Sequence, residues 1–148
     1  MMLRPTAKAL KLLGVNRAGL ADRPHDDDDW YLDFLWIEQR KCLLLTHAGT
    51  LFSIFTIDVR LPQIRPIGGW ALSTIRDALA EEGLPEDCLG TLDATQVSLG
   101  RATDRRTLAF MERSRPGGTP RSRMGRWARA LRPGWPEPSP STSPPQPW

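Results

Sequence analysis

Apolar and polar residues follow a helical pattern at the start of the chain. Residues 7–13 place their apolar side chains near one side of a helix and their lysines opposite, which predicts a short amphipathic helix. Thr6 is the expected N-cap, because its hydroxyl can accept a hydrogen bond from a free backbone N–H of the first turn. Gly14 is the expected stop, because glycine tolerates the left-handed conformation that ends many helices.

Three later segments have the pattern of β-strands. Residues 30–37 and 42–46 are rich in aromatic and branched side chains, and residues 50–57 alternate between two faces. The links between these segments are short, so we expect the strands to form an antiparallel meander. Both outer strands are apolar on both faces, which predicts that a helix covers the sheet.

The pattern becomes helical again after a connector at residues 58–69, which holds prolines and a glycine pair. Apolar residues recur at helical spacing from Leu72 to Glu82, and a shorter helix is expected from Pro85 to Leu92. Residues 94–99 are a candidate fourth strand. Thr103-Asp104 is the expected cap of a final helix.

Composition divides the chain at Met111 into two unlike parts. Lys+Arg 20 against Asp+Glu 17 gives a net charge of +3, of which residues 112–148 carry 7 − 2 = +5 and residues 1–111 carry 13 − 15 = −2. The second part is rich in arginine, proline and serine without apolar periodicity, so we expect it to be disordered. For residues 1–111 we predict one small α+β domain, an antiparallel meander of three or four strands with packed helices.

Several segments carry a resemblance to a known family: Leu3-Arg4-Pro5-Thr6, Leu12-Leu13-Gly14, Trp30-Tyr31, Ile37 through Thr46, Thr50-Leu51-Phe52-Ser53, Val59-Arg60, and Thr103 through Leu108 with Met111. Over residues 2–111 the chain resembles a bacterial domain-of-unknown-function family, number 6933 in its series. The Arg-Lys-Cys-Leu-Leu block is the most specific part of the match. The family has no established activity, so the resemblance bears on the fold and implies no reaction.

The resemblance ends abruptly after Met111. In the family, the last block looks like T-x-x-R-S-V-L-G-x-M-N-D-L-A-F and opens a helix of several turns, whereas this chain continues Glu112-Arg113-Ser114-Arg115. One spelling of Met-Glu-Arg-Ser-Arg is ATG GAA CGA TCT CGC, and removing one G after ATG gives Met-Asn-Asp-Leu and the start of an alanine codon. We therefore interpret residues 112–148 as an out-of-frame translation product. A domain truncated there would expose apolar strand faces at residues 30–37 or 50–57 and favour self-association.

The chain has no recognisable catalytic or metal-binding motif. Its two cysteines form neither a disulfide framework nor a four-ligand metal set, and Cys42 is expected to be a buried thiol. The aspartate run 26–29 lacks the spacing of an EF-hand, which favours a solvated acidic loop over a Ca²⁺ or Mg²⁺ site. His47 is expected to be exposed in a tight turn, without a catalytic partner. We predict no catalytic residue, no metal and no cofactor.

Four basic residues are the candidates for an anion-binding site: Arg40, Lys41, Arg105 and Arg106. The last two adjoin the start of the final helix, where backbone N–H groups and the helix dipole favour phosphate or carboxylate. The first two adjoin aromatic residues, as basic residues do on nucleic-acid surfaces. The alternative is that Asp104 caps the helix while the arginines pair with acids such as Glu81 or Glu82.

The lack of a convergent His, Cys, Ser and carboxylate set favours a non-catalytic interaction or accessory module. The alternative is an anion- or nucleotide-binding module, or an enzyme, that uses Arg105, Arg106 and Lys41. Because residues 1–111 are net negative, nucleic-acid binding is not expected of the folded domain and would be non-specific through the basic residues after Met111. No run of eighteen or more apolar residues exists, so we expect no membrane span. The two cysteines form no disulfide framework and no secretory signal is recognisable, so we expect a cytoplasmic chain.

The nucleotide sequence tests the interpretation of residues 112–148. We expect a one-base change near codon 112 to restore an amphipathic helical pattern after Met111, because the break in periodicity and the change in composition fall at the same residue. A gene in which no such change restores the pattern contradicts the interpretation.

Overall fold

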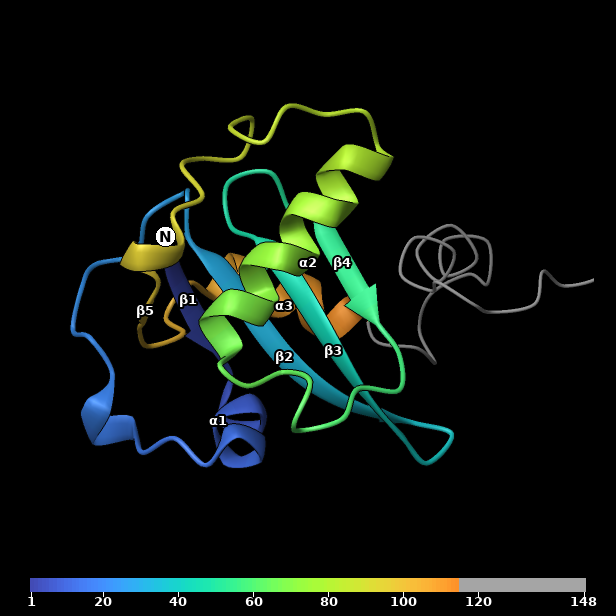
Figure 1. Ribbon diagram of the computed structural model, residues 1–148. Helices are drawn as coiled ribbons and strands as arrows, with labels where there is room; N and C mark the ends of the chain where they lie inside the picture. Colours follow the sequence, from blue (N-terminus) through green and yellow to red (C-terminus); the bar gives the residue numbers. More distant parts are fainter. Residues whose placement is uncertain (115–148) are drawn as a thin grey trace, which may run out of the picture.

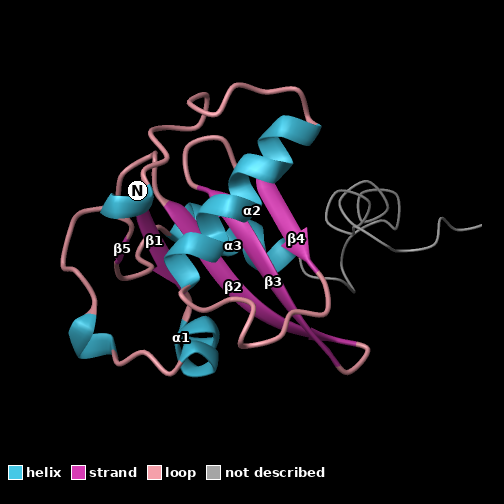
Figure 2. Cartoon of the chain, in the orientation of Figure 1, coloured by secondary structure: helices cyan, strands magenta, loops and turns pink. Residues whose placement is uncertain are grey.

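A five-stranded mixed sheet forms the centre of the fold, with the strand order β4-β3-β2-β1-β5 (Figures 1 and 2). The computed structural model describes residues 1–114. Its strands are β1 (Met2–Pro5), β2 (Trp30–Ile37), β3 (Arg40–His47), β4 (Ser53–Thr56) and β5 (Ser98–Leu99). β2, β3 and β4 pair in antiparallel fashion, and β1 runs parallel to both β2 and β5. The chain thus has an α+β fold.

The prediction of a purely antiparallel meander is correct for β2, β3 and β4 and wrong for the sheet as a whole. The N-terminal strand β1 was not predicted, because four residues that include an arginine and a proline show no strand periodicity. The candidate fourth strand is only the two-residue β5, which pairs parallel with β1. Residues 86–89 form turns where a helix was predicted. The predictions for residues 115–148 concern a part of the chain outside the described residues.

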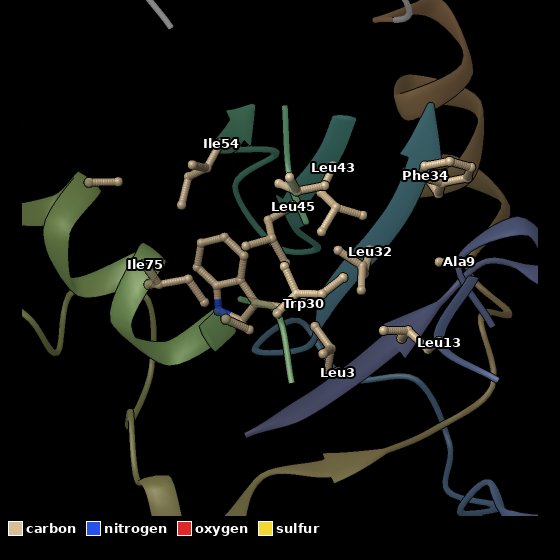
Figure 3. Packing of buried hydrophobic residues seen from close by; sticks show 14 of the residues in the cluster. Leu3, Ala9, Leu13, Trp30, Leu32, Phe34, Leu43, Leu45, Ile54 and Ile75 are labelled. Carbon is tan, nitrogen blue, oxygen red and sulfur yellow. The ribbon is translucent and has the colours of Figure 1, made fainter. Parts of the chain in front are cut away.

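One face of the sheet is covered by α2 (Ile67–Glu81), with α1 (Ala7–Leu13) beside the end of β1 (Figure 1). Figure 3 shows Trp30 at the centre of this core, among Leu3, Leu45 and Ile75. All four of these side chains are almost fully buried. The main hydrophobic core therefore joins β1, β2, β3 and α2.

The opposite face carries α3 (Arg105–Arg113), which lies behind the sheet in Figure 1. Met111 of α3 packs on a smaller apolar cluster with Tyr31, Leu35, Cys42 and Leu44. The predicted burial of the Cys42 thiol is confirmed, and helices lie on both faces of the sheet. None of the helices within residues 1–114 is long and apolar enough to cross a membrane.

The local signals at helix ends behave as the sequence predicted. The Thr6 hydroxyl accepts a hydrogen bond from the backbone N–H of Ala9, and Gly14 ends α1 in the left-handed conformation. The Asp104 carboxylate accepts hydrogen bonds from the backbone N–H groups of Arg106 and Thr107 at the start of α3. These caps fix the residues at which α1 and α3 begin, and they therefore determine which side chains of each helix face the sheet and which face solvent.

A fully buried guanidinium, that of Arg4, lies in β1. Its Nε donates to the Asp29 carboxylate at 2.6 Å, and its terminal nitrogens donate to the backbone carbonyls of Arg101, Arg23 and Pro24 at 2.5, 3.0 and 2.9 Å. The prediction of a solvated acidic loop is therefore wrong for Asp29. Burying a charge is costly unless it is paired and hydrogen-bonded, and here every contact joins β1 to a loop far from it in the sequence.

We expect Arg4→Met to lower the free energy of unfolding by about 3–5 kcal/mol, because it leaves the buried Asp29 carboxylate without its partner. Chemical denaturation monitored by circular dichroism measures this change. Arg60→Met, at an exposed arginine, is the control and is expected to cost little.

The double variant Arg4→Met/Asp29→Leu sharpens the test. It removes both charges, so it is expected to cost less than the sum of Arg4→Met and Asp29→Leu. An Arg4→Met variant as stable as Arg60→Met would contradict the structural role of the pair.

Candidate functional site

A groove of about 640 Å³ lies between α1 and the end of the β2–β3 hairpin. Its polar lining consists of three lysines: Lys8, Lys11 and Lys41. Its apolar lining comes from one turn of α1 and from the last residues of β2, namely Leu12, Phe34, Leu35, Trp36 and Ile37. We call this the basic groove.

The position of α1 follows from where β1 ends. The backbone N–H of Thr6 donates to the carbonyl of Leu32 at 2.8 Å, and the Thr6 hydroxyl donates to the Asp33 carboxylate at 2.7 Å. α1 therefore starts beside the middle of β2, and it takes the place that a longer β1 would have taken. Its core side is buried through Ala9 and Leu13, which leaves Lys8 and Lys11 exposed.

Trp36 is an exposed aromatic side chain whose ring contacts two neighbouring side chains. It is 62% exposed, the larger value of the two exposed large apolar side chains in the described part of the chain. The Phe34 ring meets it edge-on, with ring centroids 5.6 Å apart and planes at 74°. Lys41, its partner across the hairpin, holds Nζ 5.9 Å from the indole centroid. These two contacts order an indole that still faces solvent.

The charge of the groove is not neutralised from within the domain. Among residues 1–114, no carboxylate lies within ion-pair distance of Lys8, Lys11 or Lys41. The exposed residues Glu38 and Arg40 adjoin the groove at the hairpin turn and oppose each other in charge. An anion in the groove would therefore meet three ammonium groups without competing for them.

The structure does not bring the four predicted anion-site residues together. Lys41 lines the basic groove, and Arg40 is exposed next to it at the start of β3. Arg106 instead donates to the carbonyl of Ala48 at 2.8 Å, just beyond the other end of β3. Arg105 is exposed on α3 and does not line the groove. The basic groove thus contains one of the four residues.

Sequence reasoning missed Lys8 and Lys11 as partners of Lys41. Their spacing places both on the solvent side of α1, and this spacing was visible in the sequence. Their proximity to Trp36 was not visible, because it depends on the packing of α1 against β2. The expected helix cap is confirmed, because Asp104 caps α3. Within residues 1–114, neither Arg105 nor Arg106 forms an ion pair with Glu81 or Glu82.

A polar network joins His25 to the start of α3. The Tyr31 hydroxyl lies 3.2 Å from His25 Nδ1 and accepts a hydrogen bond from the backbone N–H of Asp104 at 3.0 Å. Burial raises the pKa of Asp104, but hydrogen bonds from Thr107 and from the backbone N–H of Arg106 outweigh it, and the net pKa lies below its ordinary value. These contacts pin the loop before β2 onto α3. Within residues 1–114, no three His, Cys, Asp or Glu side chains gather to hold a metal ion.

His47 is buried, so the prediction of an exposed turn histidine is wrong. It is the last residue of β3, its side chain is only 4% exposed, and its ring packs 5.1 Å from that of Trp30. Burial lowers its pKa below 6.5, although Asp28, with a carboxylate oxygen 4.0 Å from Nε2, the Leu89 backbone, Asp27 and Asp29 act in the opposite direction. The folded domain therefore favours the neutral imidazole.

The pKa of His47 predicts how stability depends on pH. The unfolded chain takes up a proton near pH 6.5 and the folded chain does so only at lower pH, so this contribution is complete above pH 6.5 and is lost below it. We expect the free energy of unfolding, measured by urea titration, to fall between about pH 7.5 and about pH 5.5, and to fall less in His47→Gln. Asp93 and Asp104, whose pKa values lie below 3.8, change the free energy of unfolding only at more acidic pH. An equal loss in both proteins would contradict this assignment.

Comparison with known proteins gives one match. The comparisons with curated proteins and with solved structures each found none. Residues 2–115 match the family described as "Domain of unknown function (DUF6933)", in agreement with the resemblance carried by the residues above. The match covers most of the 148 residues and includes every element of the fold described here, from β1 to α3. The chain therefore belongs to the DUF6933 family.

Proposed function

We propose that this protein is a non-catalytic binding module whose ligand carries phosphate groups and an aromatic ring, the chemistry of a nucleotide or of a short single-stranded nucleic acid. One observation carries the proposal: an exposed, ordered indole lies among three lysines that have no carboxylate partner within residues 1–114. Each half of this arrangement suits a different part of such a ligand.

The indole of Trp36 suits a nucleobase. Stacking of a base on an exposed aromatic side chain contributes about 1–3 kcal/mol and tolerates any base, because every base has a π-face. Phe34 and Lys41 already hold the ring, so little side-chain entropy is left to lose on binding. The apolar surface of this exposed indole is removed from water only when a ligand covers it, so its burial contributes to the free energy of binding.

The lysines suit phosphate groups. Lys8 and Lys11 project from one turn of α1, and Lys41 projects from β3 across the groove. Ammonium groups on flexible stems can meet phosphates at several positions, which favours binding without sequence specificity. The volume of the groove is within the range of small-molecule sites.

The lining argues against catalysis at this place. It contains no histidine, cysteine, serine or carboxylate, so it offers neither a nucleophile with an adjacent base nor a pair of acid and base groups. The lysines remain as electrostatic partners. Binding without reaction is the function that this set of side chains supports best, and it agrees with the absence of a catalytic motif in the sequence.

We expect fluorescence anisotropy to detect binding of a labelled ten-nucleotide oligo(dT) at low salt, and Trp36→Ala to weaken it roughly 5- to 150-fold. Trp36→Phe should retain most of the affinity, because a phenyl ring still offers a stacking face. Lys8→Gln, Lys11→Gln and Lys41→Gln should each weaken binding and lower the salt slope by about 0.7. Unlabelled ATP as competitor distinguishes a mononucleotide ligand from a chain.

The control variant is Arg105→Gln, which removes one exposed positive charge outside the groove. Every variant keeps the net +5 of residues 112–148, so non-specific attraction to those residues cancels in the comparison. Equal weakening by Arg105→Gln and by the lysine variants would contradict the proposal. So would wild-type affinity in Trp36→Ala.

A further inference from the structure

A second cavity, of about 600 Å³, lies on the other flank of α1. It is lined by Leu10 of α1, by Arg17 and Leu20 from the loop that follows, and by Arg101, Thr103 and Leu108 near the start of α3. We propose that this cavity binds an organic anion with an aliphatic body and an oxyanion head group, a carboxylate or a phosphate monoester. We call it the arginine cavity.

Two arginines from distant parts of the chain line this cavity. Arg17 opens the short 3₁₀ turn Arg17–Gly19, and Arg101 follows β5. Both are exposed, and within residues 1–114 neither forms an ion pair. The planar fork of a guanidinium matches the two oxygens of a carboxylate or phosphate, so a pair of them selects an oxyanion over a neutral group.

Two carboxylates close to the cavity walls are already engaged in structural roles. Asp33 accepts hydrogen bonds from the hydroxyl of Thr6 and from the backbone N–H of Phe34. Asp104 accepts from the backbone of α3 and from the Thr107 hydroxyl. Within residues 1–114, neither acid forms an ion pair with Arg17 or Arg101, so both guanidinium groups can still pair with an external anion.

Part of the cavity lining is apolar. Leu10 and Leu20 are buried, and Ala102 and Leu108 are half-buried. A small inorganic anion would leave this surface in contact with water, whereas an aliphatic body would cover it and gain about 25 cal/mol per Å² of apolar area. The presence of two arginines and several leucines in one lining is what selects an amphipathic anion.

Hydrogen bonds to the sheet fix the segments that form the cavity walls without a ligand. The carbonyl of Arg101 accepts from buried Arg4 at 2.5 Å, the N–H of Gly100 donates to Leu3 at 2.9 Å, and the N–H of Ala21 donates to Leu99 at 2.8 Å. Both arginines are thus carried by segments attached to the sheet. A preformed site loses less entropy on binding than one that must first assemble.

This inference is independent of the basic groove. The groove uses the flank of α1 with Lys8, Lys11 and Leu12, whereas the arginine cavity uses the flank with Ala7 and Leu10. The two sites share the helix between them and no side chain. A variant of the arginine cavity therefore leaves the lining of the basic groove unchanged.

Isothermal titration calorimetry of the full chain with octanoate tests the proposal. We expect octanoate to bind, and acetate, inorganic phosphate and 1-octanol to bind about tenfold more weakly or less, because each lacks either the body or the head group. In Arg17→Gln/Arg101→Gln, octanoate binding should fall by about tenfold or more. Ala7→Trp places an indole at the exposed rim and should block binding without touching either arginine.

Arg60→Gln removes a comparable exposed charge outside both the cavity and the basic groove, and it should bind octanoate as the unaltered protein does. Circular dichroism of each variant confirms that it is folded. No octanoate binding at millimolar concentration overturns the proposal. Undiminished binding in both Arg17→Gln/Arg101→Gln and Ala7→Trp overturns it as well, and binding of octanol equal to that of octanoate removes the role of the guanidiniums.

Discussion

The buried guanidinium of Arg4 is the constraint on which the rest of the structure depends. A charge removed from water must have its hydrogen bonds made by the protein, and Arg4 makes them with Asp29 and with three backbone carbonyls. These partners belong to the loop before β2 and to the segment between β5 and α3. The same contacts therefore place β1 inside the sheet rather than at its edge, and bring the segment that carries Arg101 against the start of α1.

The short length of β1 then determines what can form around it. The strand stops at Pro5, and Thr6 both bonds to β2 and caps α1. On the side away from β3, the second half of β2 consequently has a helix rather than a strand as its neighbour. A helix has two flanks, and each flank of α1 closes a different hollow: lysines and an indole on one side, arginines and leucines on the other. The packing of α1 beside β2 thus creates both candidate binding surfaces.

The features that sequence alone predicted are those fixed by local interactions. The capped ends of α1 and α3 and the β2–β3 hairpin depend on neighbours a few residues away, so the pattern revealed them. The pairing of β1 with β2, the burial of Arg4 and the burial of His47 depend on contacts between distant segments. The candidate site divides in the same way. Lys41 beside an aromatic hairpin was visible in the sequence, whereas its convergence with Lys8 was not. The sequence offered an anion or a carboxylate as partner of Arg106, whereas Arg106 donates a hydrogen bond to the Ala48 carbonyl.

Net charge misleads here because the domain separates its charges along the sheet. The exposed aspartates Asp27 and Asp28 lie before the start of β2, and the lysines of the basic groove lie near its end. Trp36 lies six residues after Trp30 along β2, so about 20 Å separates the start of the strand from the indole, against a Debye length of about 8 Å at physiological salt. A ligand at Trp36 therefore experiences the lysines and almost none of the acidic loop. The −2 of residues 1–111 describes the domain as a whole, and an anion that reaches the groove responds to the local charge.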